Sequence, residues 1–186
     1  MMFRACLLIA SLALASCEES EPVFGPDGRP VPQVYKIGDD DLARIQFRML
    51  DSVNILRQAR GLGLVSLSAH LNAAAKTHAL DMSVQNRPWH FGSDGSSPLD
   101  RVARAGYPGQ LIGENISETY ETEIETLSAW MAQPEARQVI LDPRARDIGF
   151  AWHQEPSGKI WWTLVMGKPE ARTQDGGEGG AGTASL

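Results

Sequence analysis

Histidine, serine and aspartate side chains gather in the nine-residue stretch HFGSDGSSP, which runs from His90 to Pro98. A histidine beside hydroxyls and an acid can act as the general base for a serine nucleophile, or it can bind a metal ion. The same residue types also cap helices and close turns without doing any chemistry. The stretch therefore raises three hypotheses: a catalytic loop, a metal site and a capped turn.

The second half of this stretch is typical of a helix start. Ser97 can cap the helix, Pro98 suits its first position, and Asp100 falls in its first turn. The segment GSDG also differs from the strained G-x-S-x-G turn that exposes a catalytic serine in α/β-hydrolases. We therefore do not expect Ser93, Ser96 or Ser97 to act as a nucleophile.

The elements that must hold this loop are predicted by hydrophobic spacing and capping residues. The expected helices span 41–60, 68–85, 97–106, 122–131 and a short segment after Pro134. In the first helix the inward face is expected to carry Leu42, Ile45, Met49, Val53 and Leu56. IGENIS is expected to be extended, and DIGFAWHQ and IWWTLVMG flank EPSGK as a hairpin. Several helices followed by a small sheet indicate an α+β fold.

The first sixteen residues are typical of an export signal, because Arg4 precedes the apolar run ACLLIASLALA, which is too short to span a membrane. The following LASC resembles the lipobox of bacterial lipoproteins, in which the cysteine is acylated and becomes the mature N-terminus. The resemblance implies that Cys17 anchors the chain to a membrane. Since Glu18 rather than an aspartate follows it, we expect the outer membrane, with the domain facing the periplasm.

Composition divides the remaining chain into three parts. Residues 17–38 are rich in proline, glycine and charge, which is typical of a lipidated N-terminus followed by a flexible tether. Residues 39–168 carry the apolar periodicity of a folded domain. Residues 169–186 are glycine-rich, and we expect this tail to be disordered.

Cysteine content bears on whether the domain can form a disulfide, and net charge bears on which classes of partner it can bind. The only cysteines are Cys6, inside the signal, and Cys17, so we expect the exported domain to fold without a disulfide. The formal net charge is −6, and no cluster of basic residues occurs. An acidic domain of this kind argues against nucleic acid as a partner.

Five segments in order resemble the bacterial branch of the CAP superfamily, also called SCP-like or cysteine-rich secretory, antigen 5 and pathogenesis-related-1 domains. They are LNAAAKTHALDM, HFGSDGSSPLDRVARAGY, GENIS, WMAQPEARQVIL and DIGFAW, followed by a closing aromatic strand, and together they span about 51–167. The resemblance implies an α-β-α sandwich, with a small antiparallel sheet between helices, and a central cleft.

In animal and plant members of this family the cleft holds two histidines and two acids that can bind a divalent ion. His90 matches the first histidine, and Glu114 of GENIS matches one acid. Gln133 stands at the position of the second acid, while Ala136 and the strand 161–164 fill the two usual places of the second histidine. Since zinc sites normally need at least three protein ligands, we expect no cofactor beyond weak binding of zinc at His90 and Glu114.

Neighbouring residues complete the expected cleft. Trp89 is expected to line it, and His78, on the inward face of its helix, is expected to form part of the core or of the cleft wall. We expect Arg101 to pair with Asp94 across the loop, and Asn115 to tie a turn through its amide.

Two functions follow from this reading. We favour a lipid-anchored envelope protein that acts as a non-catalytic binding module for a small apolar ligand, a cell-wall component or a protein partner. The alternative is a hydrolase, a peptidase or cell-wall enzyme, in which His90 and Glu114 activate water with or without a divalent metal. The pair can also be purely structural, because two buried polar groups that bond each other tie their loop to their strand.

Overall fold

The structure, a computed structural model, describes residues 35–119 and 121–170. The export signal, Cys17 with most of the tether, and the tail beyond residue 170 lie outside the described residues. A turn of 3-10 helix (Asp39–Asp41) leads into the main elements, which are α1 (Leu42–Gln58), β1 (Ser66–Leu67), α2 (Ala69–Gln85), α3 (Pro98–Arg104), β2 (Gly109–Thr119), α4 (Glu123–Ala132), α5 (Pro134–Ile140), β3 (Asp147–Gln154) and β4 (Ile160–Pro169).

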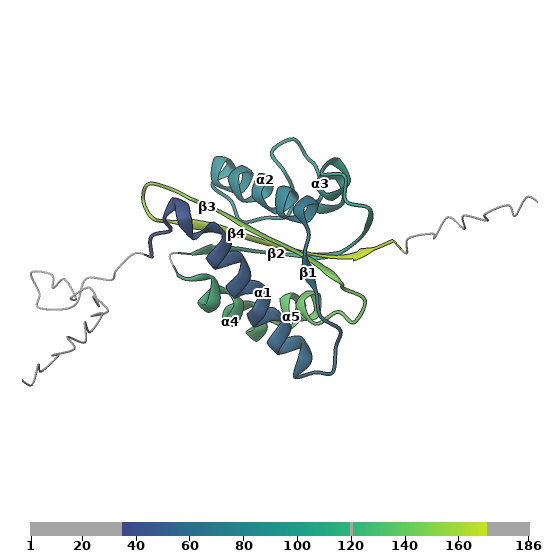
Figure 1. Cartoon of the computed structure of the whole chain (residues 1–186). Helices are drawn as coiled ribbons and strands as arrows, with labels where there is room; N and C mark the ends of the chain where they lie inside the picture. The colour runs from purple at the N-terminus through teal and green to yellow at the C-terminus, as the bar shows by residue number, and fades with distance from the viewer. Residues whose placement is uncertain (1–34, 120, 171–186) are drawn as a thin grey trace, which may run out of the picture. The chain divides into compact units, whose positions relative to one another are not determined.

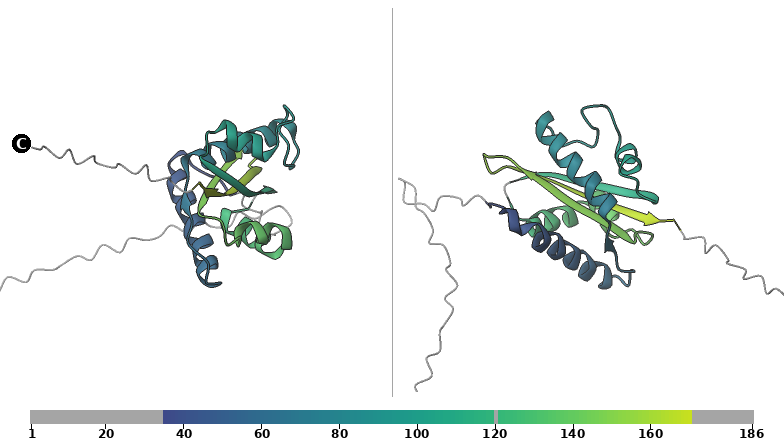
Figure 2. Two further views of the ribbon diagram at one scale, coloured as in Figure 1. Left: turned by 90° about the vertical axis from the view of Figure 1, so that its right-hand side faces the viewer. Right: turned by 45° about the horizontal axis from the view of Figure 1, so that its top comes forward.

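The domain has three layers, with one sheet between two groups of helices. Helices α2 and α3 cover one face, and α1, α4 and α5 cover the other (Figures 1 and 2). The strands lie in the order β1-β3-β4-β2. The predicted α-β-α sandwich is therefore confirmed. The sheet is mixed rather than wholly antiparallel, because the two-residue strand β1 runs parallel to β3. A two-residue strand is too short to carry a recognisable alternation of apolar and polar residues.

Strand β4 lies inside the sheet, between β3 and β2, and is buried on both faces from Ile160 to Gly167. Trp162, Leu164 and Met166 pack into the core under α1, α4 and α5. Val165 points the other way, toward α2 and α3. Alternate residues of one strand therefore supply both cores, which is the pattern expected of a strand covered by helices on each side.

The local signals for the helix ends are confirmed. The Ser68 side chain accepts a hydrogen bond from the Leu71 amide at the start of α2. Capping boxes open α3, through Ser97 and Asp100, and α4, through Thr122 and Glu125. These short polar side chains satisfy backbone amides that no helical turn can reach, so the position of each start is determined locally.

Helix α1 differs from its predicted face at both ends. Leu42, expected inside, is 54% exposed, because it lies at the first position of the helix, beyond the edge of the sheet core. Arg57 is fully buried and donates hydrogen bonds to the backbone carbonyls of Gly63, Ile140, Asp142 and Ala145. A single guanidinium therefore joins the end of α1 to the loop that precedes β3.

The folded part extends beyond the predicted limits of 39–168. Tyr35 and Ile37, assigned to the tether, pack against the core on the α1 side, and the Ile37 amide donates to the Gln154 side chain. At the other end, β4 continues to Pro169. Among the described residues, none of the helices combines the length and the apolar character that a membrane span requires.

Candidate functional site

His90 and Glu114 meet at a cleft of about 420 Å³ beside the β2 edge of the sheet. The loop that follows α2 carries His90, and β2 carries Glu114. The His90 Nδ1 lies 2.9 Å from Glu114 Oε1. The Glu114 side chain is only 3% exposed, whereas that of His90 is 49% exposed. The cleft wall is completed by Pro88, Trp89, Asn115, Ile116, Trp130, Gln133, Glu135, Ala136 and Val139.

Arg101 binds the Glu114 carboxylate through both of its oxygens. The Arg101 Nη2 lies 2.8 Å from Oε1 and 2.9 Å from Oε2, and its Nη1 donates to the Ser96 carbonyl. The Arg101 side chain is 5% exposed, so this ion pair is buried. The predicted pairing of Arg101 with Asp94 is wrong. Asp94 binds Arg104 instead, because Arg101 is buried, whereas Arg104 and Asp94 both lie at the surface.

His78 forms the floor behind this pair and is fully buried, as its position on α2 predicted. Its Nε2 lies 3.0 Å from the Trp89 carbonyl, which fixes Nε2 as the protonated nitrogen, and 3.7 Å from Glu114 Oε1. Burial lowers the pKa of His78 below its ordinary value of 6.5; the negative charge of Glu114 opposes this effect, and Arg101 adds to it. His78 is therefore a neutral core residue at neutral pH, and it is not among the residues that line the cleft.

The serines of the loop are engaged in building it. The Ser93 hydroxyl donates to Asp81 on α2 at 2.6 Å, and the Ser97 hydroxyl donates to Asp100 at 2.7 Å. In the described part of the chain no hydrogen bond joins a serine hydroxyl to His90. This geometry has the features of a capped turn and lacks those of a nucleophile with its base.

The prediction that Asn115 ties a turn through its amide is wrong. It lies within β2, 4% exposed, and its amide donates to the Ala136 carbonyl of α5 at 2.9 Å. The eleven-residue length of β2, well beyond the segment IGENIS, explains the difference. Asn115 thereby holds α5 against the sheet and closes the cleft on that side.

The residues present do not fit a divalent metal ion. Both Glu114 oxygens contact Arg101, and His78 directs its protonated nitrogen toward the Trp89 carbonyl. Gln133 and Ala136 stand in the lining where the family resemblance implies further ligands. Within 35–119 and 121–170 no group of three or more histidines, cysteines or acids could hold a metal. The buried guanidinium already supplies the positive charge that a cation would bring.

Two features of the site could not be predicted from the sequence. Arg101 belongs to an ordinary amphipathic helix pattern, so nothing marked it as the partner of an acid thirteen residues away. Glu135, in the first turn of α5, lines the cleft together with His90, and its position depends on how α5 packs on β2. Neither role has a local signal that sequence reasoning could have used.

Comparison with known sequences places most of this domain in one family. The pattern that describes the cysteine-rich secretory protein (CAP) family matches residues 50–166. The chain is also 30% identical, over 121 residues, to the uncharacterised protein YkwD of Bacillus subtilis, covering 65% of this chain and 46% of YkwD. The chain thus spans about half the length of this relative.

Solved structures show the same fold at low sequence identity. An outer surface protein of Borrelia burgdorferi superposes with a TM-score of 0.64 at 16% identity, over 74% of this chain and all of that chain. An extracellular protein of Bacillus anthracis that contains an SCP domain superposes with a TM-score of 0.63 at 21% identity, over 72% of this chain and 45% of that chain.

The buried ion pair generates a stability prediction. We expect Arg101→Met to lower the free energy of unfolding by about 3–5 kcal/mol, because it leaves the buried Glu114 carboxylate without its cation. The exposed pair of Arg104 with Asp94 offers the matched control, and Arg104→Met is expected to cost at most about 1 kcal/mol. Urea unfolding of both variants measures the difference.

If Arg101→Met is too unstable to purify, the double variant with Glu114→Met is expected to recover most of the loss, since it removes both buried charges. Equal, small losses in the two single arginine variants would show that the pair does not hold loop and strand together.

The buried His78 generates a pH prediction. The folded protein keeps His78 neutral at a pH where the unfolded chain protonates it, so the unfolded state binds more protons and stability falls as the pH drops below about 6.5. Urea midpoints at about pH 7.5 and about pH 5.5 measure this loss. We expect His78→Gln to reduce the loss and the exposed His70→Gln to leave it unchanged. An NMR titration in which the His78 ring protonates at or above its ordinary pKa would contradict this account.

Proposed function

Because this chain belongs to the cysteine-rich secretory protein (CAP) family, we propose that its cleft serves a non-catalytic binding module of the bacterial cell envelope. The ligand we propose is a cell-wall component. The observation that carries the proposal is that both oxygens of Glu114 are engaged by Arg101 while the His90 ring remains half exposed at the rim. The carboxylate holds the histidine in place, and the histidine faces the ligand.

A carboxylate in this position is a poor general base. General base catalysis requires an oxygen that can accept a proton from water within hydrogen-bond reach. Arg101 donates to both oxygens of Glu114 at 2.8 and 2.9 Å, and the His90 Nδ1 makes a further contact at Oε1. The alternative function, a hydrolase that uses His90 and Glu114, would therefore have to use the half-exposed His90 ring as its base, with Glu114 orienting that ring.

The cleft lining combines aromatic rings with hydrogen-bonding groups. Trp89 stands beside His90 at the rim, while Gln133 and Glu135 line it from the start of α5. Trp89 is itself braced, since its Nε1 donates to Gln85 and the Arg87 guanidinium lies 3.8 Å from its ring centre. A rigid aromatic residue with polar neighbours suits a ligand that presents both an apolar face and hydroxyl or amide groups. Cell-wall polymers have this chemistry.

The module is proposed to be held at the membrane by its N-terminus. An export signal followed by the lipobox-like LASC supports acylation of Cys17. Acyl chains hold a protein at a bilayer by burying their methylene groups, and a folded domain at the end of a tether remains free to reach the cell wall. The proposed location is the outer membrane, with the domain in the periplasm.

The binding function is tested by co-sedimentation of the full chain with purified peptidoglycan sacculi. We expect the wild type to sediment with sacculi and to release no soluble fragments from them. We expect His90→Ala and Trp89→Ala to weaken binding by about 10-fold or more, because these are the side chains proposed to contact the ligand directly. His153→Ala, on β3 and outside the cleft lining, is the matched control and is expected to bind normally.

Two outcomes would contradict this function. Release of soluble fragments that disappears in His90→Ala would establish the hydrolase instead. Retention of the protein on lipid vesicles or on a protein partner, with no retention on sacculi, would assign the cleft to a different ligand class.

The anchor has its own test. We expect mass spectrometry of the native protein to find a mature N-terminus at Cys17 that carries acyl groups, and Cys17→Ser to move the protein from the membrane fraction to the soluble fraction. An unmodified Cys17, or a mature N-terminus elsewhere, would overturn the anchor and leave the binding function to be judged separately.

A further inference from the structure

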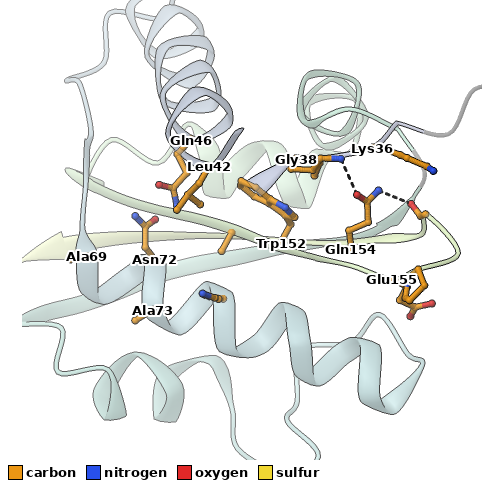
Figure 3. A pocket seen from close by; sticks show the side chains of 15 residues that line it. Lys36, Gly38, Leu42, Gln46, Ala69, Asn72, Ala73, Trp152, Gln154 and Glu155 are labelled. Carbon is orange, nitrogen blue, oxygen red and sulfur yellow. Dashed lines mark hydrogen bonds between the residues drawn. The ribbon is translucent and has the colours of Figure 1, made fainter. Parts of the chain in front are cut away.

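A second cavity, of about 850 Å³, lies at the opposite edge of the sheet from the His90 cleft. Its walls are the start of α1 and one face of α2, and its floor is strand β3 (Figure 3). On this side, strand β3 has a neighbour only along its first two residues, where β1 pairs with Asp147 and Ile148. The rest of this strand therefore presents an open edge to the cavity.

Side chains satisfy the first part of this edge. The Phe150 amide donates to Asn72 Oδ1 at 2.8 Å, and the Phe150 carbonyl accepts from Gln46 Nε2 at 2.8 Å. Both backbone groups of Phe150 thus point away from β4. Because the direction of these groups repeats every second residue along a strand, the amide and carbonyl of Trp152 point the same way. No described residue bonds to either group of Trp152.

At the far end of the edge, the Gln154 side chain holds the segment of Tyr35 and Ile37 beside the strand. Gln154 Oε1 accepts from the Ile37 amide at 2.9 Å, and Gln154 Nε2 donates to the carbonyls of Tyr35 and Gly158. Figure 3 shows Gln154 at one end of the cavity and Gln46 and Asn72 at the other, with Trp152 between them. By the same alternation the amide and carbonyl of Gln154 also point outward, and no described residue bonds to them, so the open edge consists of Trp152 and Gln154.

The charge around this opening is positive. Lys36 and Lys76 line the cavity, and neither forms a salt bridge with any residue of the described ranges. Glu155 also lines it, but its carboxylate accepts from the Trp161 indole at 2.7 Å and lies 3.8 Å from Lys159. The two lysines stand out on a chain whose formal net charge is −6. They favour an occupant that carries a carboxylate.

The cavity also offers apolar surface for a side chain. Leu42, which is 54% exposed at the start of α1, and Ile37 line the cavity together with Trp152. Ala73 on α2 is exposed and leaves room on the opposite wall. Side chains of an extended peptide would therefore meet apolar surface at Leu42 and Ile37 and a lysine on each side, Lys36 before α1 and Lys76 on α2.

We propose that this cavity is a docking site for an extended peptide segment that carries a carboxylate. One residue of the peptide exchanges two hydrogen bonds with the amide and carbonyl of Trp152, as an added strand does in β-augmentation. The carboxylate lies toward Lys36 and Lys76, and an apolar side chain contacts Leu42. This site is separate from the proposed function of the His90 cleft and does not depend on it.

The test uses the full chain and a blocked pentapeptide of alternating valine and glutamate as the probe. NMR spectra and amide hydrogen exchange report on the Trp152 amide. We expect the peptide to slow exchange of this amide by about 10-fold at saturation, because pairing protects it from water. An analogue with glutamine in place of glutamate is expected to bind about 2- to 5-fold more weakly, the size of effect typical of exposed ion pairs.

Matched variants distinguish binding in this cavity from non-specific binding of the peptide. Ala73→Phe fills the cavity from an exposed helix position and is expected to abolish protection of Trp152, whereas Val84→Phe, at an exposed position of the same helix outside the cavity lining, is expected to have no effect. Lys76→Gln is expected to weaken binding of the glutamate peptide to the level of the glutamine peptide. Lys168→Gln, exposed and outside the cavity lining, is the control for the loss of a lysine.

Three results would overturn the proposal. They are equal binding of a fully N-methylated peptide, which cannot donate to Trp152; spectral changes confined to the His90 cleft; and no slowing of Trp152 exchange at any peptide concentration. Because Trp89→Ala is expected to leave peptide binding intact, failure here and failure of the cell-wall function are distinguishable.

Discussion

Strand β4 is buried on both of its faces, and this constraint governs where the other elements lie. An eight-residue stretch that is buried in both directions needs a helical layer on each side, and the two cores are built from its alternate residues. Trp162 stacks on Phe150 with ring centres 5.3 Å apart, so β3 is held beside it as part of the same core. With no cysteine among the described residues, the sandwich depends on this packing rather than on disulfides.

The buried pair of Arg101 and Glu114 plays a corresponding part at the cleft. It joins α3 to β2, and through His90 it also fixes the loop after α2. The same contacts that give the cleft its shape engage both oxygens of the Glu114 carboxylate. Taking such a charge pair out of water costs desolvation energy, which the short contacts between the two side chains offset. This is the physical basis for proposing that the cleft binds rather than reacts.

The two edges of the sheet are covered in different ways. The β2 edge lies beside the cleft, while the β3 edge is covered by amide side chains that imitate a neighbouring strand. Proteins commonly blunt exposed edges, because unpaired backbone groups invite pairing with other chains. Here the covering stops at Trp152, and two lysines line the opening. An opening this short suits a short extended partner.

The sequence alone determined the features whose causes are local. The capping boxes at Ser97 and Thr122, the hairpin around EPSGK and the apolar strand that became β4 are each specified by residues within a few positions of one another, and the ordered family motifs predicted the sandwich and the meeting of His90 with Glu114. Tertiary structure decided the rest. The choice of Arg101 over Arg104 as the partner of Glu114, the burial of Arg57 among distant carbonyls and the open edge at Trp152 depend on how helices far apart in sequence pack on the sheet. No local pattern encodes those distances, because they are set by the three-dimensional fit of the two cores.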